Sequence, residues 1–157
     1  RLDNIEIVTL QADKEVQLNE RISVRPIQIP HRSEYTETVG FVVRGPNRAM
    51  LYIPDIDKWE RWSTPIEDVI ATVDRAYLDG TFYADGEIKG RAMADIPHPF
   101  VTESIERFGP LSASERNKIH FLHLNHTNPL LQPSAPEHGQ VSRAGMHVAR
   151  RGERLEL

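Results

Sequence analysis

The chain has 157 residues, a length that suits one domain with a buried core. Its formal charge is −4, from 19 basic and 23 acidic residues, which argues against the broad basic surface that a nucleic-acid partner requires. No apolar run reaches the roughly 18 residues that span a bilayer, and no cysteine is present for disulfides or thiolate zinc ligands. We therefore expect a small-molecule substrate and no membrane partner. The cytoplasm is the default location, and a homodimer is left open.

The first third of the chain has the pattern of β-structure. Apolar and polar side chains alternate with the period of a strand, most clearly over 22–29. Asn19-Glu20 and Gly45-Pro46-Asn47 are typical of turns between strands. The predicted strands are 5–8, 16–18, 22–29, 39–43 and 49–53.

Helices and strands then alternate. Thr64-Pro65, followed by two acidic residues, is a typical helix start, and a second helix is predicted over 99–108. Strands are predicted at 76–78 and 118–124, with a final hairpin from 146–148 to Leu155. This interleaving predicts the α/β class.

Histidines and an aspartate follow the predicted strands, where α/β proteins place their sites. His31 and Asp55 come directly after two early strands, and His123 and His126 end a late one. His98 lies in a loop between two prolines. Taken singly, such residues are usually turn, capping or surface residues. His120 cannot join His123 on a straight strand, because side chains alternate, so we assign it a structural role with satisfied hydrogen bonds.

Their order along the chain resembles the metallo-β-lactamase superfamily, in which a lone histidine, a bridging aspartate and a last histidine complete a two-metal site. Pro30-His31-Arg32, Leu51-Tyr52-Ile53-Pro54-Asp55 and Phe121-Leu122-His123 match these three ligands. Leu78-Asp79-Gly80-Thr81-Phe82 resembles the strand that follows the bridging aspartate. The stretches 90–98 and 123–129 resemble most the branch of pyrroloquinoline-quinone biosynthesis protein B and related phosphodiesterases.

The resemblance implies a four-layer αββα sandwich, of which residues 1–157 supply about the C-terminal half. The family's upstream His-x-His-x-Asp-His motif does not occur in the chain. We therefore expect a missing N-terminal segment, or another chain, to carry these four ligands; the alternative is that the chain is a degenerate member of the family. The implied metal ligands here are His31, Asp55 and His123.

The resemblance implies a metal-dependent hydrolase that uses a metal-bound water on an ester or phosphodiester of a small molecule. Two zinc ions are expected in the complete protein, with manganese or iron as alternatives. Asp57 and Asp79 are expected to accept hydrogen bonds from the ligating histidines. His98 and His126 are predicted to be catalytic, as acid or oxyanion donors.

Two other functions stay open. The pyrroloquinoline-quinone branch implies an oxidoreductase with iron, which histidine and carboxylate ligands also suit. A non-catalytic binding module would use the same side chains only in turns and caps. Metal analysis separates these alternatives.

Overall fold

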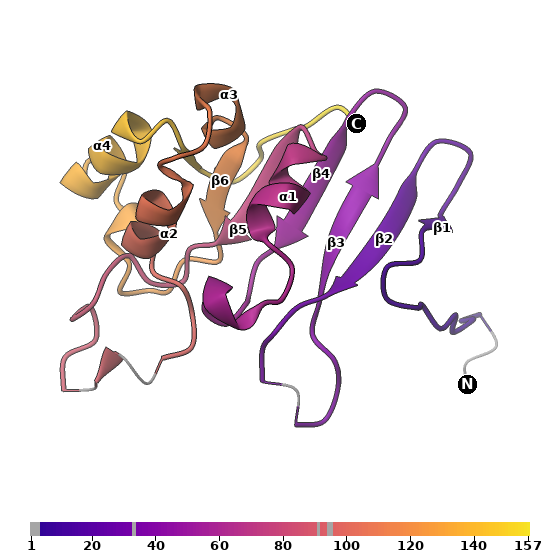
Figure 1. Ribbon diagram of the computed structural model, residues 1–157, viewed down its shortest axis with the longest axis horizontal. Coiled ribbons are helices and arrows are strands. Elements are labelled where there is room, and N and C mark those ends of the chain that lie inside the picture. Colours follow the sequence, from indigo (N-terminus) through magenta and orange to yellow (C-terminus); the bar gives the residue numbers. More distant parts are fainter. Residues whose placement is uncertain (1–3, 33, 91, 94–95) are drawn as a thin grey trace.

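The computed structural model describes residues 4–32, 34–90, 92–93 and 96–157. Within this part of the chain, seven strands form one sheet in the order of the sequence (Figure 1). The strands are β1 (Val16–Gln17), β2 (Ser23–Gln28), β3 (Val39–Arg44), β4 (Ala49–Ile53), β5 (Arg75–Asp79), β6 (Ile119–Leu122) and β7 (His147–Val148).

The strand directions decide where a site can form. β2, β3 and β4 pair antiparallel in succession, so β2 and β4 run the same way. β5 and β6 then pair parallel to β4 and to each other. The carboxyl ends of β2, β4, β5 and β6 therefore meet at one edge of the sheet, and the segments that follow them lie side by side.

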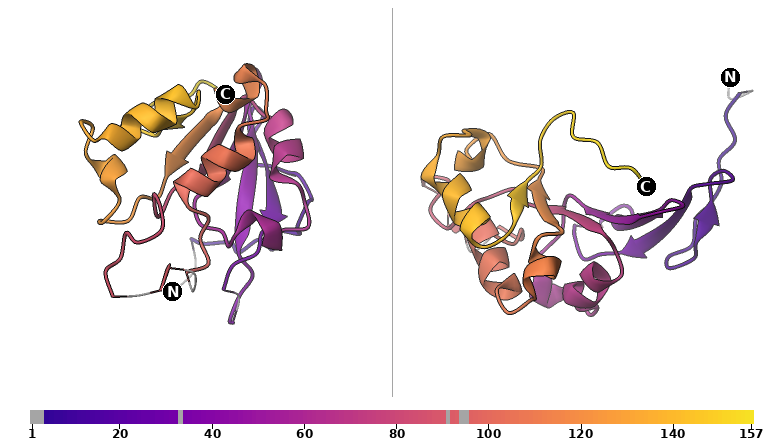
Figure 2. Two further views of the ribbon diagram at one scale, coloured as in Figure 1. Left: turned by 60° about the vertical axis from the view of Figure 1, so that its left-hand side comes forward. Right: turned by 90° about the horizontal axis from the view of Figure 1, so that it is seen from above.

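The helices divide between two places. Figure 2 shows α1, α2 and α3 on one face of the sheet, while α4 lies apart from them beside the β6–β7 edge. None of the helices in the described ranges is long and apolar enough to cross a membrane. The helices are η1 (Trp59–Arg61), α1 (Ile66–Ala71), α2 (Val101–Phe108), α3 (Ala113–Arg116), η3 (Pro129–Leu131) and α4 (Pro136–Arg143).

The core lies between the sheet and these helices. Leu51 and Ile53 of β4 are fully buried there, in one cluster with Ile70 of α1 and Phe108 of α2. Burying such side chains contributes roughly 1.5–3 kcal/mol each. The alternation of β4 follows from this one-sided core, because Tyr52 points the other way and remains 38% exposed.

The other face of the sheet is apolar but only partly covered. Phe41 and Val43 of β3 share that face with Met50 and Tyr52 of β4, and each is half-buried or exposed. The last residues of the chain cross from β7 toward the β3–β4 turn, where Leu157 packs against Gly45.

Most predicted elements are present, with three corrections. The run 5–8 forms no strand, because its apolar side chains find no partner strand in the described residues and stay exposed. The final hairpin is also wrong, because residues 149–157 form no strand and β7 pairs parallel with β6 instead. The short helices α3 and α4 were not predicted; α4 begins at Pro136 and has a weak apolar face with Val141 as its buried residue.

His120 is structural, but its hydrogen bonds are not satisfied as predicted. It is 7% exposed on β6, its ring stacks on His147 with centroids 4.6 Å apart, and its buried Nδ1 has no hydrogen-bond partner in the described part of the chain. Burial, together with the positive charge of Arg75, lowers the pKa of His120 from 6.5 to about 4.

This depressed pKa predicts acid sensitivity. The unfolded chain takes up the proton below about pH 6.5, while the folded chain takes it up only near pH 4, so stability falls across that window, by up to about 3 kcal/mol. His120→Phe removes the titration and should flatten this loss in urea unfolding measured from pH 7 to 4.5. The control variant His126→Gln, at an exposed position, should lose as much stability on acidification as the wild type. Equal pH dependence of wild type and His120→Phe would contradict the assignment.

Candidate metal centre

The predicted site residues come from the shared carboxyl edge of the strands. His31 follows β2, Asp55 follows β4, Asp79 is the last residue of β5, and His123 directly follows β6. His98 comes from the loop that leads into α2. The parallel directions of these strands, rather than closeness in the sequence, bring the five residues to one place.

The Asp79 carboxylate organises the centre. It is fully buried, and four donors surround it. Oδ1 accepts from the backbone N–H of Thr81 at 2.8 Å and from its hydroxyl at 2.7 Å. Oδ2 accepts from the backbone N–H of Ile56 at 3.0 Å and from Nδ1 of His98 at 2.8 Å. Because an ionised carboxylate offers about four acceptor positions, Asp79 is saturated by the protein itself.

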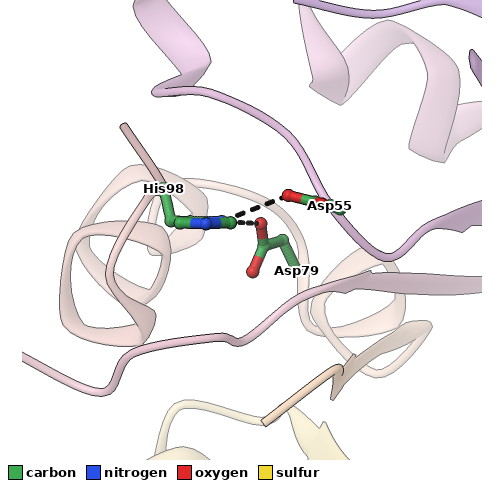
Figure 3. A group of neighbouring side chains, drawn as sticks. All are labelled: Asp55, Asp79 and His98. Atoms are coloured by element: carbon green, nitrogen blue, oxygen red, sulfur yellow. Dashed lines mark hydrogen bonds and ion pairs between the residues drawn. The ribbon is translucent and has the colours of Figure 1, made fainter. Parts of the chain in front are cut away.

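His98 is oriented by this carboxylate. Its Nδ1 lies 2.8 Å from Asp79 Oδ2 and 3.4 Å from Asp55 Oδ1, as Figure 3 shows. Burial lowers the pKa of His98, but its hydrogen bond to Asp79 and the negative charges of Asp79, Asp55 and Asp57 outweigh burial and raise it. Since Nδ1–H donates to Asp79, the neutral ring keeps the lone pair of Nε2 free for another partner.

Asp55 is the one carboxylate of the centre with an unsatisfied buried oxygen. Its Oδ1 is buried and has no hydrogen-bond partner among the described residues, although it lies 3.4 Å from His98 Nδ1. Its Oδ2 lies 3.3 Å from His31 Nε2. An unpaired buried carboxylate oxygen is costly, so this position favours a bound cation.

His31 faces two carboxylates at once. Its Nδ1 lies 3.2 Å from Asp57 Oδ1, and its Nε2 lies 3.3 Å from Asp55 Oδ2. A neutral imidazole can donate to only one of them, so its other nitrogen must face a carboxylate oxygen with a lone pair. Asp57 is the acceptor, because the Nδ1–Oδ1 pair has hydrogen-bond geometry, and Arg61 holds the same carboxylate in place at 2.9 Å. Nε2 of His31 and Asp55 then need a proton or a metal ion between them.

His123 joins the centre through Thr81. Its Nδ1 lies 2.9 Å from the Thr81 hydroxyl, and the ring is otherwise exposed. Its backbone has a φ of 62°, in the left-handed region that residues with a Cβ seldom adopt. This conformation ends the alternation of β6 and turns the side chain toward Thr81.

The structure does not bring His126 to the other predicted residues. The side chain is exposed, and its Nδ1 lies 3.1 Å from Asn125 Oδ1. Its hydrogen bonds within the described ranges reach none of the other site residues. The predicted catalytic role of His126 therefore has no geometric support here, while the same prediction for His98 stays compatible with its position.

Sequence analysis missed Thr81 and Arg61. Thr81 had a signal, because an Asp-Gly-Thr turn after a strand lets the aspartate accept from the amide two residues on. Arg61 had none that we recognise, since it binds Asp57 through the η1 turn.

The arrangement can hold a divalent cation. The carboxylates Asp55, Asp57 and Asp79 lie around His31 and His98, and Arg61 pairs with Asp57, so a positive ion beside Asp55 would relieve the remaining repulsion. Ligand atoms of Asp55, Asp79 and His98 lie within 4.8 Å of one another. We do not assign Asp79 as a ligand, because its four acceptor positions are occupied.

Comparison with known proteins decides the family. A family model described as "Beta-lactamase superfamily domain" matches residues 1–133, which is more than half of the chain. The chain belongs to the beta-lactamase superfamily. The predicted fold is confirmed by a solved structure, Zn(2+)-bound PqqB from Methylobacterium extorquens, with a TM-score of 0.76 and 22% identity. The match covers 96% of this chain and 55% of that one.

Curated relatives of this superfamily member share one name. This chain is 32% identical over 133 residues to a coenzyme PQQ synthesis protein B of Methylobacterium radiotolerans. The match covers 80% of this chain and 42% of the relative. A protein of the same name from Gluconobacter oxydans is 27% identical over 129 residues, over 77% and 40%. The chain thus spans less than half the length of these relatives.

The left-handed backbone of His123 gives a test of the local geometry. His123→Gly and His123→Ala both remove the ring, but only Ala keeps a Cβ that disfavours a φ of 62°. We expect the Gly variant to be more stable than the Ala variant by about 1 kcal/mol in urea unfolding. An Ala variant as stable as the Gly variant would show that His123 is not left-handed.

Proposed function

We propose that this chain is the C-terminal half of a metal-dependent enzyme of the metallo-β-lactamase type, with Asp55, His31 and His123 as ligands. The observation that carries the proposal is the buried Oδ1 of Asp55, which has no hydrogen-bond partner in the described residues. The two histidines support it, because each has its Nδ1 against an oxygen acceptor. This leaves Nε2 as the nitrogen that could bind a metal.

The ligand atoms of Asp55, His31 and His123 are of types that bind divalent metal ions. Carboxylate oxygen and neutral imidazole suit zinc, and also manganese or iron. When bound, such a cation would lower the pKa of a water molecule to roughly 7 and make it nucleophilic at neutral pH. Asp57 and Thr81 would orient the ligating rings of His31 and His123, and Asp79 would orient His98.

His98 is the residue we propose for proton transfer. Its ring lies beside His31, with centroids 5.7 Å apart, and against Phe82 at 5.8 Å. Both histidines line a pocket of about 190 Å³ with Arg32, Phe82 and Pro97, among others. A small molecule bound there would lie against the rings of His31 and His98. A raised pKa favours the protonated ring, the state that a general acid needs.

The remaining ligands of a two-metal centre would come from outside this chain. We propose a preceding segment, or a partner chain, that carries His-x-His-x-Asp-His. Two observations support this: the chain covers 42% of a relative, and one apolar face of its sheet is only partly covered. A second sheet packed over Phe41, Met50 and Tyr52 would bury that face and complete a sandwich.

The relatives favour a second candidate for the reaction. They are named for coenzyme PQQ synthesis, so an iron-dependent oxidation in the synthesis of that coenzyme competes with hydrolysis of a small ester or phosphodiester. His and Asp ligands do not separate the two. Stoichiometric iron in the complete protein would favour oxidation, whereas zinc alone would not decide, because a solved PqqB structure itself holds Zn(2+).

Metal binding by the complete protein tests the centre, because the remaining ligands of a two-metal site would come from outside this chain. Wild type, Asp55→Asn and a control, Asp68→Asn at an exposed position of α1, are loaded with Zn²⁺, desalted and analysed for metal. We expect Asp55→Asn to lose bound zinc and Asp68→Asn to keep it, because the amide cannot supply a charged oxygen ligand. Equal zinc in Asp55→Asn and wild type would contradict the assignment, and no zinc in wild type would favour a non-catalytic module.

Turnover by the complete protein tests the two predicted catalytic histidines. We expect His98→Ala to lower kcat by roughly 10²–10⁴-fold with metal content unchanged, as for loss of a general acid. His126→Ala should leave kcat near the wild-type value, because its exposed ring lies against Asn125. Loss of metal in His98→Ala would instead identify His98 as a ligand.

A further inference from the structure

We propose that Thr81 is a positioning residue that fixes the tautomer of His123, so that Nδ1 carries the proton and Nε2 presents its lone pair to the metal. The proposal rests on the function proposed above only for the metal; the tautomer itself follows from the protein's hydrogen bonds. Thr81 is 7% exposed and lies in the turn after β5, directly between Asp79 and His123.

The argument counts protons. The Thr81 hydroxyl has one, and two partners lie within reach: Asp79 Oδ1 at 2.7 Å and His123 Nδ1 at 2.9 Å. An ionised carboxylate can only accept, so the hydroxyl proton goes to Asp79. The Thr81 oxygen can then only accept from His123. Nδ1 of the neutral imidazole must therefore be the protonated nitrogen, and Nε2 the unprotonated one.

A second hydrogen bond to Asp79 fixes the orientation of the Thr81 hydroxyl. Asp79 Oδ1 also accepts from the backbone N–H of Thr81 at 2.8 Å, which fixes Thr81 against the carboxylate. The other oxygen of Asp79 is held by the amide of Ile56 and by His98. Asp79 therefore cannot turn away to free the Thr81 proton for His123. One saturated carboxylate thus sets the tautomers of both His98 and His123.

His123 needs such an anchor. Its backbone is left-handed and its ring is exposed, so packing does little to hold the side chain in one orientation. The bond from Nδ1 to Thr81 is the side-chain hydrogen bond recorded for it within the described ranges. Without that bond the ring could rotate and protonate either nitrogen. A ligand held in the wrong tautomer presents N–H, not a lone pair, to a metal.

The ring nitrogens of His123 can be observed directly. Two-dimensional ¹H–¹⁵N correlation through the imidazole carbons distinguishes the two neutral tautomers in metal-free protein, with His123→Gln identifying the signals. We expect wild type to show protonated Nδ1, Thr81→Ser to keep it, and Thr81→Val to gain the tautomer protonated on Nε2. Thr72→Val is the matched control, because Thr72 also donates its hydroxyl to one acceptor but lies at the end of α1.

Zinc affinity is the second measurement. Thr81→Val should bind Zn²⁺ about 10–100-fold more weakly than wild type by calorimetry, as for other partners of metal ligands. Thr81→Ser should restore wild-type affinity, because it returns the hydroxyl without the methyl group. Rescue by serine separates positioning from simple packing, since a packing role depends on the methyl group that serine lacks.

Each result bears on the proposal. A wild-type His123 protonated on Nε2 would overturn it without any variant, so it remains falsifiable if Thr81→Val fails to fold. An unchanged tautomer in Thr81→Val would overturn it as well. If the complete protein binds no zinc in any variant, the proposed function fails, while the wild-type tautomer still decides the role of Thr81.

Discussion

The candidate centre depends on one buried carboxylate. Asp79 is fully buried at the end of β5. Four hydrogen-bond donors offset the desolvation cost of burying its charge. Those donors come from the segment after β4, the turn after β5 and the loop before α2. The same hydrogen bonds that stabilise Asp79 therefore tie three separate segments together. They also fix where His98, Thr81 and, through Thr81, His123 must stand.

Around the Asp79 carboxylate, Asp55, His31 and His123 keep ligand atoms that a cation could bind. Asp57 is satisfied by Arg61 and His31, whereas Asp55 keeps a buried oxygen without a hydrogen-bond partner in the described residues. His31 and His123 both direct Nδ1 at oxygen. In this centre, Asp57 and Asp79 are paired within the protein and Asp55 is not. The side chains are therefore already arranged before an ion binds, and binding needs little reorganisation.

Local sequence patterns predicted the strands and strand ends but not the contacts that depend on tertiary packing. Alternation of apolar and polar residues predicted β2, a short apolar run before Pro54 predicted β4, and the ends of these strands pointed to His31 and Asp55. The run at 5–8 has the same composition as a strand but lacks a partner, which local sequence cannot reveal. The left-handed turn at His123 and the contact of Thr81 with it arise from tertiary packing, so neither was predicted. The near-parallel stack of His120 on His147 depended on the unforeseen β6–β7 pairing.

The most direct test of the central claim is the location of the metal itself. Crystals of the complete protein, measured at the zinc and iron absorption edges, would show each ion as an anomalous difference peak. The account predicts a peak about 2.0–2.2 Å from a carboxylate oxygen of Asp55 and from Nε2 of His31, with Asp79 still bound to Thr81 and His98. A peak bound to Nδ1 of His31, or an ion that leaves Asp55 without a metal partner, would contradict it.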